Sequence, residues 1–406
     1  MGQVKQKFLG SKGLILLIAM LSAFVPLSTD LYLPALPGMS VYFGVDAGRI
    51  NLTISLFFIF YALGTLIWGP LSDRLGRRTV LLVGLSIYLV ASAFCASAKT
   101  VEVLMAFRVL QAIGGSAAGA VATAIVKDVY SGKQRQSVLA IVQSMVTISP
   151  AVAPVLGAFL LKVMSWRGVF WTLMGIGILA LIGALLFEET LLERNPGRLH
   201  QSFARMGVVL QNKRFTLLLL LFSLTSVASL AFITSSTYIY QDNFHLSSQV
   251  YSFYFSVNAL GMTVAPMLYL WLAKRADTQK IIYICFGTAA LSGLMICLFG
   301  NTQPWIFALC ILPSTLANSC IRPPSVNLML DQQKGDSGSV SSLIGCSSLL
   351  MGSLGMQLMS LPWQNAILAI GILTLGIAAF SFIVWPLLHN YVAKHAAETR
   401  PETTSF

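Results

Sequence analysis

Long apolar runs are the feature that most restricts how this chain can fold. A helix needs about 20 apolar residues to cross the hydrocarbon core of a bilayer, and runs of about that length recur along the whole chain. Only 10 % of the residues are charged, against roughly 25 % in soluble domains, which is too few to cover a water-facing surface. We therefore predict an all-α membrane protein with twelve spans, at about 13–35, 49–70, 78–97, 102–125, 137–161, 167–187, 214–238, 249–273, 280–299, 304–328, 338–360 and 364–388.

The lysines and arginines indicate how these spans are oriented. If the N-terminus is cytoplasmic, 20 of the 26 lie in cytoplasmic segments and four lie outside, while Arg108 and Arg322 lie within spans. Basic residues accumulate on the cytoplasmic side of membrane proteins. We therefore expect both termini in the cytoplasm, and the net charge of +12 indicates membrane topology rather than nucleic-acid binding.

A long polar segment, residues 188–213, divides the spans into two sets of six. The segment 69–73 is echoed at 273–277, displaced by 204, and 128–132 is echoed at 331–335, displaced by 203. Two nearly equal offsets indicate duplicated halves, as in transporters that bind substrate between two repeats. We predict two pseudo-symmetric six-helix bundles, with an N-terminal bundle at 1–190, a cytoplasmic linker at 191–213, a C-terminal bundle at 214–390 and a cytoplasmic tail at 391–406.

The turn between the second and third spans carries the most specific motif, G-P-L-S-D-R-L-G-R-R. Its basic residues alone would identify a cytoplasmic turn. The whole string resembles the signature loop of major facilitator superfamily transporters, which implies the two-bundle fold of that family. We expect Asp73 to act in gating by approaching the start of the eleventh span near Ser337, where a helix N-terminus favours an anion. The residues that carry the resemblance, and the gating role it implies, are Gly69, Asp73, Arg74, Gly76, Arg77 and Arg78.

The fifth span contains the run S-P-A-V-A-P-V-L-G-A, residues 149–158. Pro150 and Pro154 each remove a backbone donor and can kink the helix, while Gly157 permits close contact with a neighbour. A proline-kinked packing helix would explain these residues without any role in transport. The run also resembles the span-5 motif of antiporters in the superfamily, although Ala158 stands where that motif often has a second glycine. The eleventh span lacks such prolines, and this asymmetry favours export over uptake.

Of the fourteen acidic residues, Asp30 alone falls inside a predicted span. A charge within the membrane is a functional hypothesis by default, although Asp30 could also be solvated at the outer interface. Its segment, S-T-D-L-Y-L-P-A-L-P, resembles the first-span motif of the bicyclomycin-resistance (Bcr/CflA) branch of drug:proton antiporters.

Arg108 in the fourth span matches an arginine that the superfamily links to proton transfer, and we expect it to pair with Asp30. Burial favours a neutral carboxyl group and a nearby arginine favours the carboxylate, so a modest rearrangement could bind or release a proton. We therefore assign proton coupling to Asp30 and Arg108.

The substrate surface is less specified. A broad apolar pocket with few fixed polar groups suits lipophilic drugs of several shapes, although most aromatic side chains in a membrane protein simply pack or face lipid. Arg322 either reaches toward the cytoplasm or lines the cavity, where it would disfavour cationic drugs; the sequence leaves both open. The other candidates are Tyr32, Phe58, Tyr61, Gln111, Met145, Tyr238, Tyr254 and Asn258.

The resemblance implies a monomeric, proton-driven exporter of lipophilic antibiotics, such as bicyclomycin or chloramphenicol-like compounds, in a bacterial inner membrane. It needs no cofactor or metal beyond the proton gradient. The alternative is a proton-coupled symporter for a sugar or small metabolite, but the spans hold few polar residues that could fix sugar hydroxyls. An enzyme is not expected, because the four histidines lie in loops, near a span end or in the tail and form no catalytic or metal-binding spacing.

Overall fold

The computed structural model describes residues 6–191, 199–333 and 337–398. Within these ranges the regular elements are all helical, and twelve segments are long and apolar enough to cross a membrane, as predicted. The spans are α1 (Gly10–Asp30) with η1 (Leu33–Ala35) and α2 (Leu36–Phe43), α3 (Ala47–Leu75), α4 (Arg77–Ala96), α5 (Val101–Val129), α6 (Gly132–Val163), α7 (Trp166–Leu186), α9 (Lys213–Tyr238) with η2 (Ile239–Asn243), α10 (Ser248–Leu272), α11 (Thr278–Phe299), α12 (Pro304–Leu330), α13 (Ser337–Met359) and α14 (Ala366–Glu398).

Several helices begin at polar residues in the turns. The Asp46 carboxylate accepts a hydrogen bond from the backbone N–H of Arg49 at 2.8 Å, and the Asn212 side chain accepts two from the first turn of α9. Such side chains satisfy N–H groups that the first turn of a helix leaves without partners. Helical structure therefore extends past the apolar runs: α3 covers 47–75, where the apolar run predicted 49–70.

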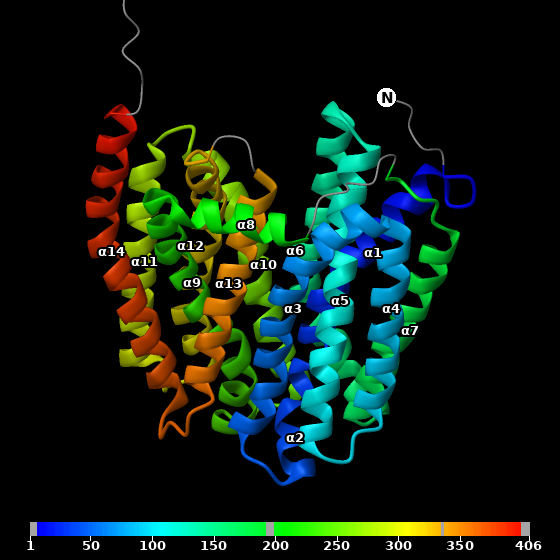
Figure 1. The fold of residues 1–406 in the computed structure, drawn as a ribbon. Helices are drawn as coiled ribbons and strands as arrows, with labels where there is room; N and C mark the ends of the chain where they lie inside the picture. Colours follow the sequence, from blue (N-terminus) through cyan, green and yellow to red (C-terminus); the bar gives the residue numbers. More distant parts are fainter. Residues whose placement is uncertain (1–5, 192–198, 334–336, 399–406) are drawn as a thin grey trace, which may run out of the picture.

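The spans form two bundles, which Figure 1 shows side by side. The first contains α1 to α7, in which α1 packs on α6, α3 on α5, α4 on α5 and α4 on α7. The second contains α9 to α14, and its pairs correspond one by one: α9 with α13, α10 with α12, α11 with α12 and α11 with α14. The bundles meet through α3 with α13 and α6 with α10, which are also equivalent pairs. The packing is therefore that of a duplicated fold.

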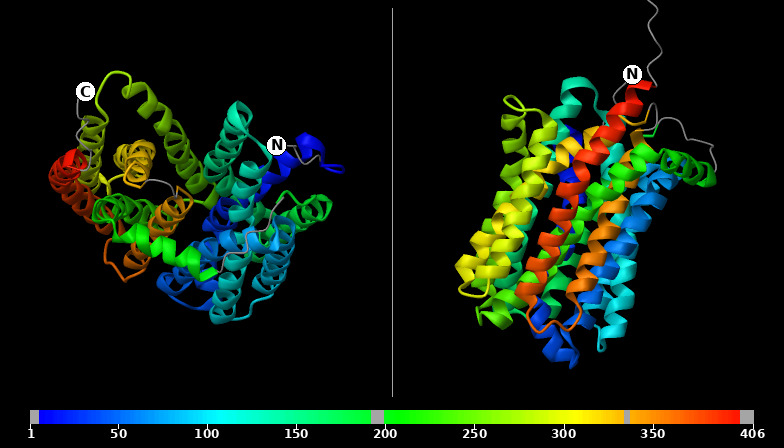
Figure 2. Two further views of the ribbon diagram at one scale, coloured as in Figure 1. Left: turned by 45° about the horizontal axis from the view of Figure 1, so that its top comes forward. Right: turned by 90° about the vertical axis from the view of Figure 1, so that its left-hand side faces the viewer.

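The linker and the tail are more helical than a polar segment suggests. Residues 199–211 of the predicted linker form α8 (Leu199–Gln211), which lies across one end of the second bundle (Figure 2). Residues 192–198 of the linker and 399–406 of the tail lie outside the described residues. Helix α14 continues to Glu398, eight residues into the predicted tail. Val392 packs against the apolar core of the second bundle there, which favours further helix.

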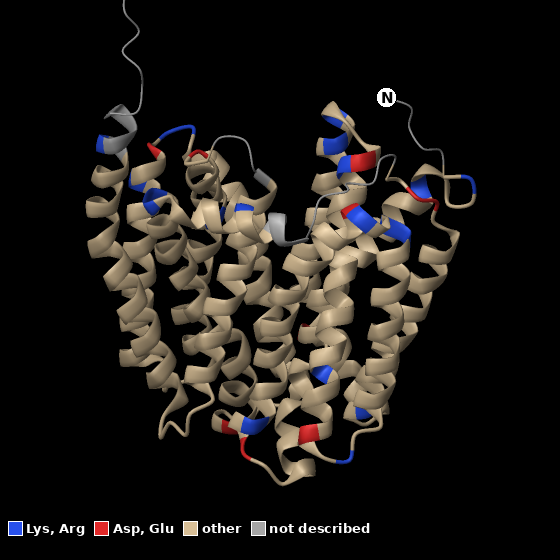
Figure 3. Ribbon diagram, in the orientation of Figure 1, with Lys and Arg blue, Asp and Glu red and all other residues tan. Residues whose placement is uncertain are grey.

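Charged side chains gather at the two ends of the bundles, as Figure 3 shows. Lysine and arginine cluster at the end that carries α8, which we call the basic end, and it holds the segments predicted to be cytoplasmic. The opposite end carries α2 and is called the α2 end. Because charge is costly to place in hydrocarbon, this distribution is the one expected for a membrane protein.

Candidate functional site

Asp30 is the last residue of α1, at the point where the chain turns into η1. Its side chain is only 6 % exposed, which argues against a carboxylate simply solvated at the membrane surface. The Thr29 hydroxyl donates a hydrogen bond to Oδ1 of Asp30 at 3.1 Å. Three residues later, the carbonyl of Leu33 accepts a hydrogen bond from Thr237 of α9 at 3.0 Å, so Asp30 lies close to the second bundle. The site is thus a buried carboxyl group near the contact between the two bundles.

Arg108 is fully buried in α5, seven residues after the helix begins. Its Nη1 donates to the side chain of Gln111 at 2.6 Å and to the backbone carbonyl of Ser28 on α1 at 3.1 Å. Its Nε and Nη2 have no hydrogen-bond partner among the described residues. Aromatic faces attract a cation, and the guanidinium carbon lies 4.9, 4.3 and 5.8 Å from the ring centres of Tyr32, Phe57 and Phe170.

The predicted pairing of Asp30 with Arg108 is absent, since no ion pair joins them among the described residues. The reason is the rotation of α1. Ser28 presents its carbonyl to Arg108, and Asp30 follows two residues later, about 200° further around the helix. Asp30 therefore points away from Arg108, and two donors of the arginine have no partner among the described residues.

Hydrogen bonds from α10 to backbone carbonyls of α6 join the two bundles. Pro150 and Pro154 interrupt the helical hydrogen bonding of α6, and the carbonyls of Thr147 and Ala151, three residues before each proline, accept bonds from α10. A Cβ added to Gly157 would collide with the backbone carbonyl of Leu31, directly after α1, so the predicted close contact is present. The four bonds are Thr263 to Thr147 at 3.0 Å, Ser256 to Ala151 at 2.5 Å, Ser252 to Pro154 at 3.0 Å and Gln249 to Ala158 at 3.1 Å.

Further contacts join the bundles toward the α2 end. Thr237 donates to the carbonyl of Leu33 at 3.0 Å, and Gln357 of α13 donates to Ser55 of α3. The described hydrogen bonds between the bundles therefore lie between the middle of the spans and the α2 end.

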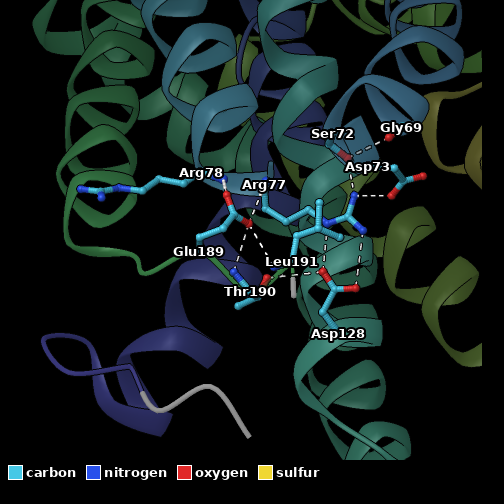
Figure 4. Close-up of polar contacts among 9 residues, drawn as sticks. All are labelled: Gly69, Ser72, Asp73, Arg77, Arg78, Asp128, Glu189, Thr190 and Leu191. Atoms are coloured by element: carbon cyan, nitrogen blue, oxygen red, sulfur yellow. Dashed lines mark hydrogen bonds and ion pairs between the residues drawn. The ribbon is translucent and has the colours of Figure 1, made fainter. Parts of the chain in front are cut away.

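The α3–α4 turn at the basic end forms a polar cluster around Arg77, which is 5 % exposed (Figure 4). Arg77 Nε donates to Asp128 at 2.9 Å, and its Nη1 donates to Ser72 at 2.6 Å and to Asp73 at 2.5 Å. Gly76 has a φ of +102°, and a Cβ there would meet the Glu189 carboxylate. The turn thus needs glycine at 76.

The Glu189 carboxylate caps the start of α4 from the end of α7 (Figure 4). It accepts the backbone N–H groups of Arg77 at 2.9 Å and Arg78 at 3.0 Å, and also those of Thr190 and Leu191 at 3.0 and 3.1 Å. An anion at a helix N-terminus is favoured both by these donors and by the helix dipole.

The sequence of this chain matches a known family of proteins. Residues 18–356 match the family model described as Major Facilitator Superfamily. The chain belongs to the major facilitator superfamily. It is therefore a transporter rather than an enzyme, as expected.

Relatives and solved structures of this superfamily resemble the chain over different lengths. A chloramphenicol resistance protein of Pseudomonas aeruginosa is 39 % identical over 186 residues, covering 45 % of this chain and 44 % of that protein. A bicyclomycin resistance protein homolog of Haemophilus influenzae is 25 % identical over 362 residues, covering 87 % and 89 %. The uncharacterized MFS-type transporter YdgK of Bacillus subtilis is 28 % identical over 363 residues, covering 87 % and 90 %. A solved bacterial homolog of the human lysosomal transporter Spinster has a TM-score of 0.75 at 17 % identity, covering 94 % of this chain and 99 % of that one.

In this superfamily transporter, the residues of the signature loop differ in what they contact. Arg77 and Asp73 lie in the polar cluster, and Arg78 donates to the carbonyl of Leu185 at 2.6 Å. Arg74 is exposed, and Gly69 has open space where a Cβ would lie. The predicted approach of Asp73 to Ser337 concerns a side chain outside the described residues.

Two residues of the cluster, Asp128 and Glu189, were not singled out as functional from the sequence. Their signal was weak, because acids in loops are common, and Glu189 lies 112 residues from the helix that it caps.

The predicted substrate residues differ in exposure. Tyr32 and Gln111 are fully buried, and Phe58 and Asn258 are nearly so. The Gln111 side chain accepts a hydrogen bond from Arg108 at 2.6 Å and donates one to Ser92 at 2.8 Å, and its role in substrate binding stays a prediction. Tyr32 faces Arg108, and its hydroxyl forms a hydrogen bond with Thr53 at 3.0 Å. Tyr61, Tyr238 and Tyr254 are half-buried, whereas Met145 and Arg322 are exposed.

The cap on α4 yields a first prediction. Glu189→Gln removes the charge that four N–H groups share, and bonds to charged groups are worth about 1.5–3 kcal/mol. We expect a loss of about 2 kcal/mol in stability, measured as a fall of several degrees in the unfolding temperature of the detergent-solubilised protein. Glu188→Gln is the matched control, since no bond to its side chain is described. Equal unfolding temperatures for the two variants would contradict the capping role.

The contact between α6 and α10 yields a second prediction. Each hydroxyl removed by Ser252→Ala and Ser256→Ala costs a hydrogen bond of about 1 kcal/mol. The double variant should shift the conformational equilibrium at least about tenfold toward separation at the α2 end. Electron–electron distance measurements between spin labels at Val41 and Asn301 would detect this as a larger population at long distance.

Ser248→Ala is the control for that experiment, because it lies on the same helix and no hydrogen bond from its side chain is described. A distance distribution unchanged by the double variant would show that these bonds do not hold the α2 end closed.

Proposed function

We propose that this chain is a proton-coupled antiporter that exports lipophilic antibiotics across a bacterial inner membrane by alternating access. The observation that carries the proposal is the buried carboxyl group of Asp30, which lies near the contact between the bundles and two residues from the Ser28 carbonyl that accepts a hydrogen bond from the buried Arg108. The names of the relatives from Pseudomonas aeruginosa and Haemophilus influenzae support antibiotics as the substrate class. Because one chain supplies both bundles, a monomer is sufficient for transport. Both termini are proposed to lie in the cytoplasm.

Asp30 is the proposed proton site. An ionised carboxylate is costly to bury without a positive partner, and the described hydrogen-bond partner of Asp30 is one hydroxyl group. We infer that Asp30 holds its proton in this conformation. Contacts of Thr237 and Gln241 with the carbonyls of Leu33 and Pro34 cover the turn that follows Asp30. Separation of the bundles at the α2 end would therefore open a path for protons to Asp30.

Arg108 is the proposed partner of the carboxylate once the proton has left. Its Nε and Nη2 donors are unused in this conformation, and leaving such donors buried without partners is unfavourable. Rotation at the end of α1 would bring Asp30 toward these donors. The arginine keeps its charge throughout, so it stabilises the ionised state and does not carry the proton away.

Drug export and proton entry are coupled because the drug and the proton exclude one another. A proton on Asp30 and a drug in the cavity favour opposite conformations, or compete directly, and each can shift the equilibrium only by its difference in affinity for the two states. The interrupted helix α6 supports export as the direction, since its proline run resembles the antiporter motif and its carbonyls hold the contact with the second bundle.

Drug-induced proton movement in everted membrane vesicles tests the proposal. Adding a substrate antibiotic should release protons from the vesicle lumen when the wild-type protein is present. Asp30→Asn should reduce this release to the level of vesicles without the protein, because the amide cannot carry the proton. The matched control is Asp46→Asn, an exposed acid at the same end of the bundle whose role as a helix cap asparagine preserves.

Proton release by the Asp30→Asn variant at the wild-type rate would remove Asp30 from the mechanism. No proton release with any antibiotic, together with proton-linked uptake of a sugar or metabolite by whole cells, would instead favour the symporter.

A further inference from the structure

Arg322 is the second arginine within a span, and its environment differs from that of Arg108. It lies eight residues before the end of α12, or about 12 Å from the basic end at the helical rise of 1.5 Å per residue. Arg108 is fully buried, whereas the side chain of Arg322 is exposed. Among the described residues, no ion pair or side-chain hydrogen bond of Arg322 occurs.

The exposure of Arg322 is toward the interior of the protein. The side chain is exposed, and one turn earlier Asn318 donates a hydrogen bond to Ser229 of α9, so both residues lie on the side of α12 that faces α9. α12 itself packs against four other helices, α9, α10, α11 and α13. A side chain on this face points toward other helices and away from lipid, so its exposure indicates the wall of an internal cleft. Of the two possibilities left open by the sequence, the geometry favours the cavity.

Polar groups accompany Arg322 on the same face of α12. Asn318 lies one turn deeper and donates a hydrogen bond to Ser229 of α9 at 3.3 Å. Residues four apart share a helix face, so Arg322 lies on the side of α12 that meets α9. An oxygen-rich group bound to the guanidinium would have an amide and a hydroxyl nearby.

The charges along the middle of the described spans are unbalanced. They comprise two arginines, Arg108 and Arg322, and the single carboxyl group of Asp30. Even with Asp30 ionised, positive charge exceeds negative charge. A cleft walled by low-dielectric protein focuses such a field, attracting anions and repelling cations.

We propose that Arg322 binds substrate and that the transported class is amphiphilic monoanions, compounds with an apolar body and one carboxylate-type group. The proposal rests on the export function above and narrows its substrate class. A guanidinium presents two parallel N–H donors that match the two oxygens of a carboxylate. An unpaired arginine in the middle of a span is costly to maintain, and a ligand carboxylate supplies the partner that the chain itself does not.

Equilibrium binding to the purified protein in neutral detergent tests this without requiring transport. Three fluorescent probes share one apolar body and differ in charge: dansylglycine is an anion, dansylglycinamide is neutral and dansylethylenediamine is a cation. The wild-type protein should bind the anion at least tenfold more tightly than the neutral probe, and the cation most weakly. Arg322→Gln should remove the preference, while Arg322→Lys should keep part of it because the charge remains.

Arg205→Gln is the matched control, since Arg205 is exposed on α8 and its loss should leave the preference unchanged. Equal binding of the three probes, an undiminished preference in Arg322→Gln, or no binding of any probe to the wild-type protein would each overturn the proposal. The binding measurement does not depend on proton movement, so it can fail or succeed independently of the vesicle assay. Anion binding through Arg322 without drug-induced proton release would refute antiport and leave the anion site standing.

Discussion

The cost of placing charge in hydrocarbon is the constraint on which the rest of this structure depends. It confines most charged side chains to the two ends of the bundles. The exceptions are accommodated in three different ways. Three aromatic rings, a carbonyl and an amide surround Arg108, and a single hydroxyl accompanies the buried Asp30. Arg322 is exposed and forms no ion pair among the described residues. Each arrangement leaves donors or charge without a partner among the described residues, and the proposed proton site and anion site both rest on this.

The fold could be predicted from the sequence because membrane spans are constrained by length and backbone chemistry alone. A chain in lipid must satisfy its own backbone hydrogen bonds, so an apolar run of sufficient length is a helix. The duplicated halves were visible because polar landmarks recur at 203 and 204 residues. The helix ends were harder to predict from the sequence, because caps such as Asp46 extend a helix beyond its apolar run. Likewise, α14 continues past the predicted start of the tail.

The site could be predicted only in part. Asp30 and Arg108 were identifiable because a charge stands out within an apolar run, and their contacts were not, because contacts depend on how each helix is rotated. Arg108 donates to the backbone carbonyl of Ser28, and no residue type in the sequence indicates a contact with a backbone group. The three-residue spacing placed Gln111 on the same face of α5 as Arg108, and its amide oxygen accepts a hydrogen bond from that arginine. The cap supplied by Glu189 depends on a contact across 112 residues, which no local pattern encodes.

The two equivalent contacts between the bundles have diverged in their chemistry. Where α3 meets α13, side chains contribute, with Gln357 donating to Ser55. Where α6 meets α10, hydroxyl and amide groups of α10 bind backbone carbonyls along the proline-interrupted helix. A carbonyl is fixed by its helix and needs no rotamer change to accept a bond, so this contact can break and re-form without reorganising α6. Such a contact suits the repeated opening and closing that the proposed function requires.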